Sequence, residues 1–297
     1  MRWLYHALPR KDAIVALGKT DPFAPGSLDL EGFVHASYRD VARASAELYV
    51  PDDPVVLRLD PRRIPCRIDE ADTPRGPMPH VHGSIPRDAV VELVELAVLN
   101  DSPDLVTGTR FAFVAFEGMT LLDLVGALDP VSRIASMGFD PTSSCEVVAG
   151  TLGTHVWEGC GAWLGASRVR PSLGEFDVVV VPGGPGAKLL TRDTALLRWL
   201  ATFPPNRLAA SVCTGSLLWA AEGRLKRKRA TTHASAMDAL ENFGAMAQRG
   251  ARVVADEAVL TAAGVTASLD LGLELVARFT DVATRQAIAK QMEMPEA

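Results

Sequence analysis

Cys213 is the residue whose surroundings best suit it to chemistry. The apolar run 208–212 predicts a buried strand that leads directly into Cys213, and a helix through Leu217 and Leu218 is expected just after it. This order is the cysteine counterpart of the strand–nucleophile–helix elbow of hydrolases. The N–H groups and partial positive charge of the following helix favour a nucleophilic thiolate. A buried structural cysteine is the alternative, but Thr214-Gly215 after the cysteine favours a reactive thiol.

A glycine-rich segment, Pro182-Gly183-Gly184-Pro185-Gly186, follows the all-valine run 178–181. Without a Cβ, Gly183 and Gly184 let backbone N–H groups approach a ligand and stabilise negative charge on it. No Lys-Ser/Thr pair follows, so the segment is not a phosphate loop. We therefore predict an oxyanion-binding or substrate-binding role for these glycines, with a tight strand-to-helix turn as the alternative.

Two titratable residues are expected close to the thiol. Asp123 lies in the opening turn of a helix that follows the apolar run 111–116, where it could act as a general acid or base toward Cys213 or simply stabilise the helix dipole. His233 ends a predicted strand, 229–233, and could orient or deprotonate the thiol or be a hydrogen-bonded structural residue.

The elements that carry these residues alternate between apolar strands and helices. Continuous apolar strands joined by helices predict a parallel sheet covered on both faces, an α/β fold. Ligands of such sheets bind at the carboxyl ends of the strands. The segments 117–123, 182–186 and 213–215 all lie at such ends, so we expect them to meet at one site.

Four segments together resemble the ThiJ/PfpI superfamily, which is class I glutamine-amidotransferase-like, over residues 110–295. The resemblance implies a flavodoxin-like sheet sandwiched by helices. It also implies that the protein forms a homodimer. The acidic segment, Leu121-Leu122-Asp123-Leu124-Val125-Gly126, resembles the aspartate-bearing pattern of the isonitrile-hydratase-like branch, whereas other branches carry a glutamate. The four segments are Val181-Pro182-Gly183-Gly184, Val212-Cys213-Thr214-Gly215, Ala230-Thr231-Thr232-His233 and Gly264-Val265-Thr266-Ala267-Ser268-Leu269-Asp270.

This branch implies a cofactor-independent lyase that hydrates an isonitrile to an N-substituted formamide. The catalytic residues that carry over are Cys213, Asp123 and Thr214. The thiolate would attack the terminal carbon, and Asp123 would protonate the adjacent atom and then activate or position water. Two alternatives stay open: glyoxalase or deglycase action on α-oxoaldehydes, and a non-catalytic redox or electrophile sensor at Cys213. Ala234 stands where isonitrile hydratases usually have an aromatic residue, so the sequence does not identify the substrate.

Composition limits the remaining possibilities. The 297 residues carry a formal net charge of −6, which is unsuited to nucleic acid. No secretory signal is visible, and no apolar run reaches the roughly 18–20 residues of a membrane helix, so we expect a cytoplasmic protein without membrane contact. The four cysteines (Cys66, Cys145, Cys160 and Cys213) lack C-x-x-C spacing, which argues against a zinc site and a disulfide framework.

The chain is long enough for two domains. The polar segment Asn100 to Arg110 separates two apolar regions, so we predict a small domain over 1–99, a linker over 100–109 and the larger domain over 110–297. In the first domain, residues 38–49 have the spacing of a helix and 55–60 that of a strand, whereas 89–99 fits a strand or a short helix.

The first domain holds four of the six histidines, in the segments 4–7, 31–37 and 79–83. His80 and His82 stand two residues apart without familiar zinc spacing, so no metal is expected. The segments resemble the family known as domain of unknown function 952, over residues 2–97, which implies a small α+β domain similar to ADP-ribosyltransferase-like folds. We carry over His6, His35, Ser37 and His80 as candidate ligand contacts. One further hypothesis makes this domain a ligand-binding module and the second domain its effector.

Overall fold

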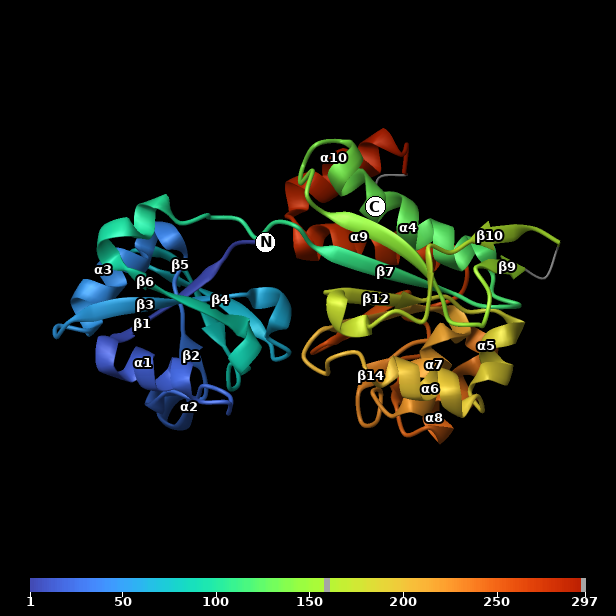
Figure 1. Ribbon diagram of the computed structural model, residues 1–297, viewed down its shortest axis with the longest axis horizontal. Coiled ribbons are helices and arrows are strands. Elements are labelled where there is room, and N and C mark those ends of the chain that lie inside the picture. The colour runs from blue at the N-terminus through green and yellow to red at the C-terminus, as the bar shows by residue number, and fades with distance from the viewer. Residues whose placement is uncertain (158–160, 295–297) are drawn as a thin grey trace. The chain divides into compact units, whose positions relative to one another are not determined.

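The chain divides into two compact units, Met1–Val106 and Thr107–Ala297. The computed structural model describes residues 1–157 and 161–294, so Cys160 lies outside the described residues (Figure 1). The predicted linker, residues 100–109, is divided between the two units after Val106. Val106 is buried in the first unit and its N–H donates to the Met1 carbonyl (3.0 Å). The Gly108 N–H donates to the Asp140 carboxylate of the second unit (2.8 Å).

The second unit is built on a seven-stranded sheet with the order β11-β8-β7-β12-β13-β17-β16. Every neighbouring pair is parallel except the edge pair β17 and β16, which is antiparallel. The sheet is therefore mixed at one edge and otherwise the predicted parallel sheet. Its strands are β7 (Arg110–Ala115), β8 (Ser144–Ala149), β11 (Arg168–Val169), β12 (Val178–Val181), β13 (Leu208–Val212), β16 (Val253–Asp256) and β17 (Val259–Ala262).

Helices cover both faces of this sheet (Figure 1). All four valines of β12 are fully buried, as expected of a central strand between two helical layers. The arrangement is the flavodoxin-like sandwich predicted from the sequence. One layer contains α4 (Leu121–Ser136), α9 (Ala267–Phe279) and α10 (Val282–Gln291), and the other contains α5 (Pro185–Leu190), α6 (Thr194–Leu200), α7 (Ser216–Glu222) and α8 (Met237–Asn242).

The predicted strand 229–233 is much shorter in the structure. Only Arg229–Ala230 (β14) is extended, and it pairs with Met246–Ala247 (β15) outside the seven-stranded sheet. The Thr231 N–H donates to the Thr261 hydroxyl (2.8 Å), which takes the chain out of the ladder. The remaining short elements of this unit are β9 (His155–Trp157), β10 (Trp163–Gly165) and the 3₁₀ turns η4 (Leu173–Glu175), η5 (Cys213–Gly215) and η6 (Ala234–Ala236).

The first unit is a small α+β domain with two antiparallel three-stranded sheets. One sheet has the order β1-β3-β6 and the other β2-β5-β4. Residues 89–99, which fitted a strand or a helix, form a strand that runs into a 3₁₀ turn. The elements are β1 (Leu4–Pro9), α1 (Arg10–Gly18), α2 (Gly26–Glu31), β2 (Val34–His35), α3 (Arg39–Tyr49), β3 (Pro54–Leu59), η1 (Pro61–Arg63), β4 (Ile68–Thr73), β5 (Gly76–Val81), η2 (Arg87–Ala89), β6 (Val90–Glu95) and η3 (Leu96–Asp101).

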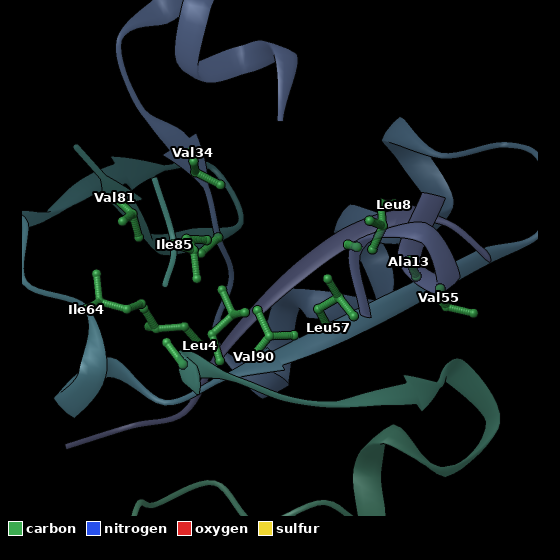
Figure 2. Close-up of a cluster of buried hydrophobic side chains, with 14 residues drawn as sticks. Leu4, Leu8, Ala13, Val34, Val55, Leu57, Ile64, Val81, Ile85 and Val90 are labelled. Carbon is green, nitrogen blue, oxygen red and sulfur yellow. The ribbon is translucent and has the colours of Figure 1, made fainter. Parts of the chain in front are cut away.

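Alternation along β1 divides the core of the first unit into two clusters. Leu4 and Leu8 pack with side chains that include Val34 and Val81 of the second sheet (Figure 2). Tyr5, between them in sequence, belongs to the other cluster, which contains residues of α3. Both faces of the β1-β3-β6 sheet are therefore covered. Among the described residues of the chain, no helix is long and apolar enough to cross a membrane.

Candidate active site

Cys213 occupies a strained turn between β13 and α7. Its φ is +54°, a left-handed conformation that non-glycine residues seldom adopt. The surrounding structure holds this turn: the Cys213 N–H donates to the Ala263 carbonyl (3.0 Å), and the Cys213 carbonyl accepts from the hydroxyls of Thr232 (2.8 Å) and Ser216 (3.0 Å). The residue is 6% exposed. This is the elbow geometry expected from the sequence, with the thiol near the carboxyl ends of the central strands.

Asp123 is fully buried in the first turn of α4, the helix that follows β7. Its Oδ2 accepts a hydrogen bond from the Gly183 N–H (2.9 Å), whereas Oδ1 has no hydrogen bond of ordinary geometry to any described residue. Burial raises the pKa of this carboxyl to about 6, although the Gly183 N–H and the Cys213 thiol lower it by smaller amounts. The pKa of this carboxyl therefore lies close to neutral pH, which suits it to act as a general base or a general acid.

The Cys213 thiol and the Asp123 carboxyl each shift the pKa of the other. Burial raises the pKa of Cys213 to about 11, and the negative charge of Asp123 contributes further to that rise. Hydrogen bonds from the Thr214 N–H, the Thr214 hydroxyl and the Val265 N–H lower the pKa of Cys213, but they do not offset the rise. The helix N-terminus was expected to favour a thiolate; burial and the negative charge of Asp123 oppose that effect by raising the pKa of Cys213, and the thiolate stays a prediction.

The glycine segment after β12 holds the site together through backbone groups. The Gly183 N–H is bonded to Asp123 (2.9 Å), and the Gly184 N–H donates to the Thr214 hydroxyl oxygen (2.9 Å). The Thr214 hydroxyl also lies 3.0 Å from the Gly184 carbonyl, to which it can donate. Because both glycine N–H groups already have protein acceptors, the predicted oxyanion role is revised. These glycines position Asp123 and Thr214.

Close packing explains why residue 183 is a glycine. A Cβ at this position would lie 2.5 Å from the Thr214 nitrogen and 2.7 Å from the Cys213 Cβ. Both neighbours belong to the strained elbow and cannot withdraw without moving it. The glycine therefore lets the segment after β12 lie directly against the nucleophile turn.

His233, predicted as a possible partner of the thiol, is hydrogen-bonded locally through its Nδ1. It precedes η6 as its N-cap, and its Nδ1 lies 2.8 Å from the Ser235 hydroxyl and 3.2 Å from the Ser235 N–H. Its ring packs against the Gly264 backbone, where a Cβ would lie 2.4 Å from the His233 Cδ2. The preceding residue, Thr232, is the one that reaches the elbow, through the Cys213 carbonyl. These contacts fit the alternative of a hydrogen-bonded structural residue, and a role of His233 toward the thiol stays a prediction.

The residue beside the sulfur that sequence reasoning missed is Val265. It follows β17 with φ +35°, and its backbone N–H is one of the groups that lower the pKa of Cys213. A valine at positive φ is a conformational outlier that no local sequence rule anticipates. The only signal was its place within the segment 264–270 that supports the family resemblance.

Three of the four candidates of the first unit are linked by contacts: His6 is hydrogen-bonded to the His35 backbone, and the His35 ring contacts that of His80. His6 and Ser37 are buried: His6 Nδ1 bonds to the His35 carbonyl (2.7 Å), and the Ser37 hydroxyl bonds to that of Ser45 (3.1 Å). Burial lowers the pKa of His6. The rings of His35 and His80 lie on one face of the second sheet, 5.2 Å apart. Hydrogen bonding within the unit thus accounts for two of the four.

No group of three or more metal-binding side chains is found in the part of the chain that the structure describes. Within the same ranges, Cys66, Cys145 and Cys213 are free thiols. Cys145 differs from Cys213 in that burial alone raises its pKa, to about 12, with no acid beside it. The coupled pair of Cys213 and Asp123 therefore distinguishes the second unit chemically.

Each of the two units matches a known protein family. Residues 112–278 match the DJ-1/PfpI family, and residues 9–93 match the family described as protein of unknown function (DUF952). An isonitrile hydratase of Pseudomonas putida is 32% identical over 185 residues, which is 62% of this chain and 78% of that protein.

Solved structures agree with this placement. A ThiJ/PfpI family protein from Pseudomonas syringae is 32% identical with a TM-score of 0.56, covering 65% of this chain and 78% of that one. Schizosaccharomyces pombe DJ-1 is 21% identical with a TM-score of 0.55, covering 63% of this chain and all of that one, a likeness that concerns the fold alone.

Proposed function

The chain belongs to the DJ-1/PfpI family, and from that premise we propose that its second unit hydrates an isonitrile to an N-substituted formamide. The observation that carries the proposal is the buried pair of Cys213 and Asp123, a thiol and a carboxyl that raise or lower each other's pKa. Addition of a thiol to an isonitrile carbon needs a nucleophile and a base that returns the proton as an acid. The similarity to an enzyme named isonitrile hydratase supports the choice of substrate class.

In the first step, the Cys213 sulfur forms a bond to the terminal carbon of the isonitrile. The thiol proton passes to Asp123 as the sulfur attacks, and then to the same carbon, giving a thioimidate, R–N=CH–S–Cys. A carboxyl with a pKa of about 6 is suited to both transfers near neutral pH, because it is neither too weak a base nor too weak an acid. No oxidant, reductant or cofactor enters this balance.

In the second step, water adds to the thioimidate carbon. Asp123 takes a proton from the water and passes it to the nitrogen, which gives R–NH–CH(OH)–S–Cys and leaves Asp123 as a carboxylate. Collapse of this intermediate breaks the carbon–sulfur bond and releases the formamide, R–NH–CHO. The hydroxyl proton returns through Asp123 to the sulfur, so the resting thiol is restored. The Thr214 N–H and hydroxyl, which lower the pKa of Cys213, stabilise the charge on the departing thiolate.

The same site weighs against the sensor alternative. Oxidation to a sulfenic acid requires the thiolate, and a thiol pKa of about 11 leaves little thiolate near neutral pH. Hemithioacetal formation with an α-oxoaldehyde needs the same nucleophile and base, so that alternative is tested beside the isonitrile.

The test is formation of N-cyclohexylformamide from cyclohexyl isocyanide by the whole chain. We expect turnover by wild type and a loss of at least about a hundredfold in Cys213→Ala and in Asp123→Asn. Cys145→Ala is the matched control, because it removes a half-buried free thiol whose pKa is raised by burial alone, and it should retain turnover. If wild type at high concentration produces no formamide, hydration is refuted, and turnover of methylglyoxal then decides for the oxoaldehyde alternative.

A further inference from the structure

A hydroxyl from a separate segment of the chain holds the strained turn of Cys213. Thr232 is fully buried, and its hydroxyl donates to the Cys213 carbonyl (2.8 Å). The Ser216 hydroxyl donates to the same carbonyl (3.0 Å), but Ser216 is only three residues further along the same turn. On the other side of the residue, the Cys213 N–H donates to the Ala263 carbonyl (3.0 Å). Thr232 and Ala263 therefore fix both peptide groups of a residue whose φ is +54°.

The segment that carries Thr232 is itself anchored on both sides. The preceding residue, Thr231, donates its N–H to the Thr261 hydroxyl of β17 (2.8 Å). The following residue, His233, packs against Gly264 just after β17, where a Cβ would lie 2.4 Å from the His233 Cδ2. β17 pairs in parallel with β13, the strand that leads into the nucleophile. The position of the Thr232 hydroxyl is thus set by the same sheet that carries the elbow.

The position of the Cys213 side chain matters because the elbow packs against the residue that holds the acid. A Cβ built on Gly183 would lie 2.7 Å from the Cys213 Cβ, so the two residues are in close contact. The Gly183 N–H donates to the Asp123 carboxylate (2.9 Å). A turn of the Cys213 backbone toward an ordinary conformation would therefore displace its side chain relative to Asp123. A displacement of about 1 Å can lower a catalytic rate by about a hundredfold.

We propose that Thr232 is a positioning residue for the nucleophile, whose hydroxyl keeps the Cys213 turn in its strained conformation and the thiol in line with Asp123. The consequence for turnover rests on the proposed hydratase function. Without the Thr232 hydroxyl, the donor from Ser216 remains, but it can move together with the turn, so the Cys213 carbonyl is free to rotate. Thr232 acts through the backbone of the nucleophile and takes no part in proton transfer.

NMR of isotope-labelled cysteine measures the conformation of the elbow without any substrate. The whole chain is labelled, and the Cys213 signals are assigned by their loss in Cys213→Ala. Because Cα and Cβ resonances depend on φ and ψ, we expect both to move in Thr232→Val, whereas Thr232→Ser keeps the hydroxyl and should retain the wild-type positions. Thr231→Val is the matched control, because it removes the neighbouring buried hydroxyl, which donates to the Ala251 carbonyl (3.1 Å) and not to the elbow. It should leave both signals in place.

Formamide production by the same variants measures the consequence for turnover. Thr232→Val should lose roughly ten- to a hundredfold in kcat, whereas Thr232→Ser and Thr231→Val should stay close to wild type. Wild-type positions of both Cys213 signals in a folded Thr232→Val protein would overturn the proposal, and so would an equal displacement in Thr232→Ser. If Thr232→Val does not fold, Thr232→Ala takes its place under the same criterion. Failure of wild type to produce formamide would refute the hydratase alone, since the NMR measurement still decides the role of Thr232.

Discussion

Asp123→Asn should make the second unit more stable at neutral pH relative to wild type, even though it removes a catalytic group. Burial raises the pKa of Asp123 from 3.8 to about 6, so the native state binds its proton more tightly than the unfolded chain does. The stabilisation from the protonated acid is complete below about pH 3.8 and is lost as the pH rises through about 6. A shift of about two pKa units corresponds to about 3 kcal/mol.

The measurement is the free energy of unfolding of the second unit in urea, from about pH 4 to about pH 8. Intrinsic fluorescence can follow it, because Trp219 is fully buried in this unit. Other titrating groups are common to both proteins, so the difference between Asn and Asp isolates residue 123. That difference should grow by about 3 kcal/mol in favour of Asn as the pH rises. A difference that stays constant with pH, or shrinks, would refute the claim that Asp123 is buried without a compensating charge.

Three further predictions concern the same pair and its support. Replacing Asp123 with Asn removes the negative charge that raises the pKa of Cys213, so iodoacetamide should alkylate that thiol at least about threefold faster near neutral pH while turnover falls; slower alkylation would contradict the pairing. Gly183→Ala places a Cβ 2.5 Å from the Thr214 nitrogen and should cost about 2–3 kcal/mol in urea unfolding, so an unchanged midpoint would count against this packing. Thr214→Val leaves the buried Gly184 N–H without its acceptor and should lower the free energy of unfolding by about 1–3 kcal/mol. Thermal melts are compared with those of Thr280→Val, which removes a hydroxyl bonded to the Val276 carbonyl (2.6 Å); an equal loss of stability in both variants would contradict a specific role for the Gly184 N–H.

Much of the architecture could be predicted because hydrophobic patterning decides it. The all-valine run of β12 and the apolar run before Cys213 are continuous, as strands buried on both faces must be, and both were expected. The strand predicted over 229–233 failed for a tertiary reason. The Thr231 N–H finds the Thr261 side chain, a residue 30 positions away, and that bond replaces the ladder. Local propensity carries no information about such a partner.

The site could be predicted in its membership but only partly in its chemistry. Residue type and position relative to the strands placed Cys213 and Asp123 at one end of the sheet. In the structure each of the two side chains shifts the pKa of the other. The raised pKa of Cys213 was not anticipated, because the helix N-terminus is visible in the sequence whereas the burial of the thiol is not. The glycine N–H groups were assigned to substrate for the same reason: their acceptors, Asp123 and Thr214, come from distant segments. Val265 was missed because no local sequence rule anticipates a valine at positive φ.

Rapid-quench mass spectrometry of the whole protein with cyclohexyl isocyanide tests the central claim most directly. Acid quenching within the first turnovers should reveal a thioimidate on the peptide containing Cys213, with the mass of one added isonitrile, and the adduct should vanish as N-cyclohexylformamide is released. Cys213→Ser should show neither adduct nor product. Formamide produced without any adduct on Cys213, or an adduct that accumulates on another cysteine while turnover continues, would contradict nucleophilic attack by this thiol.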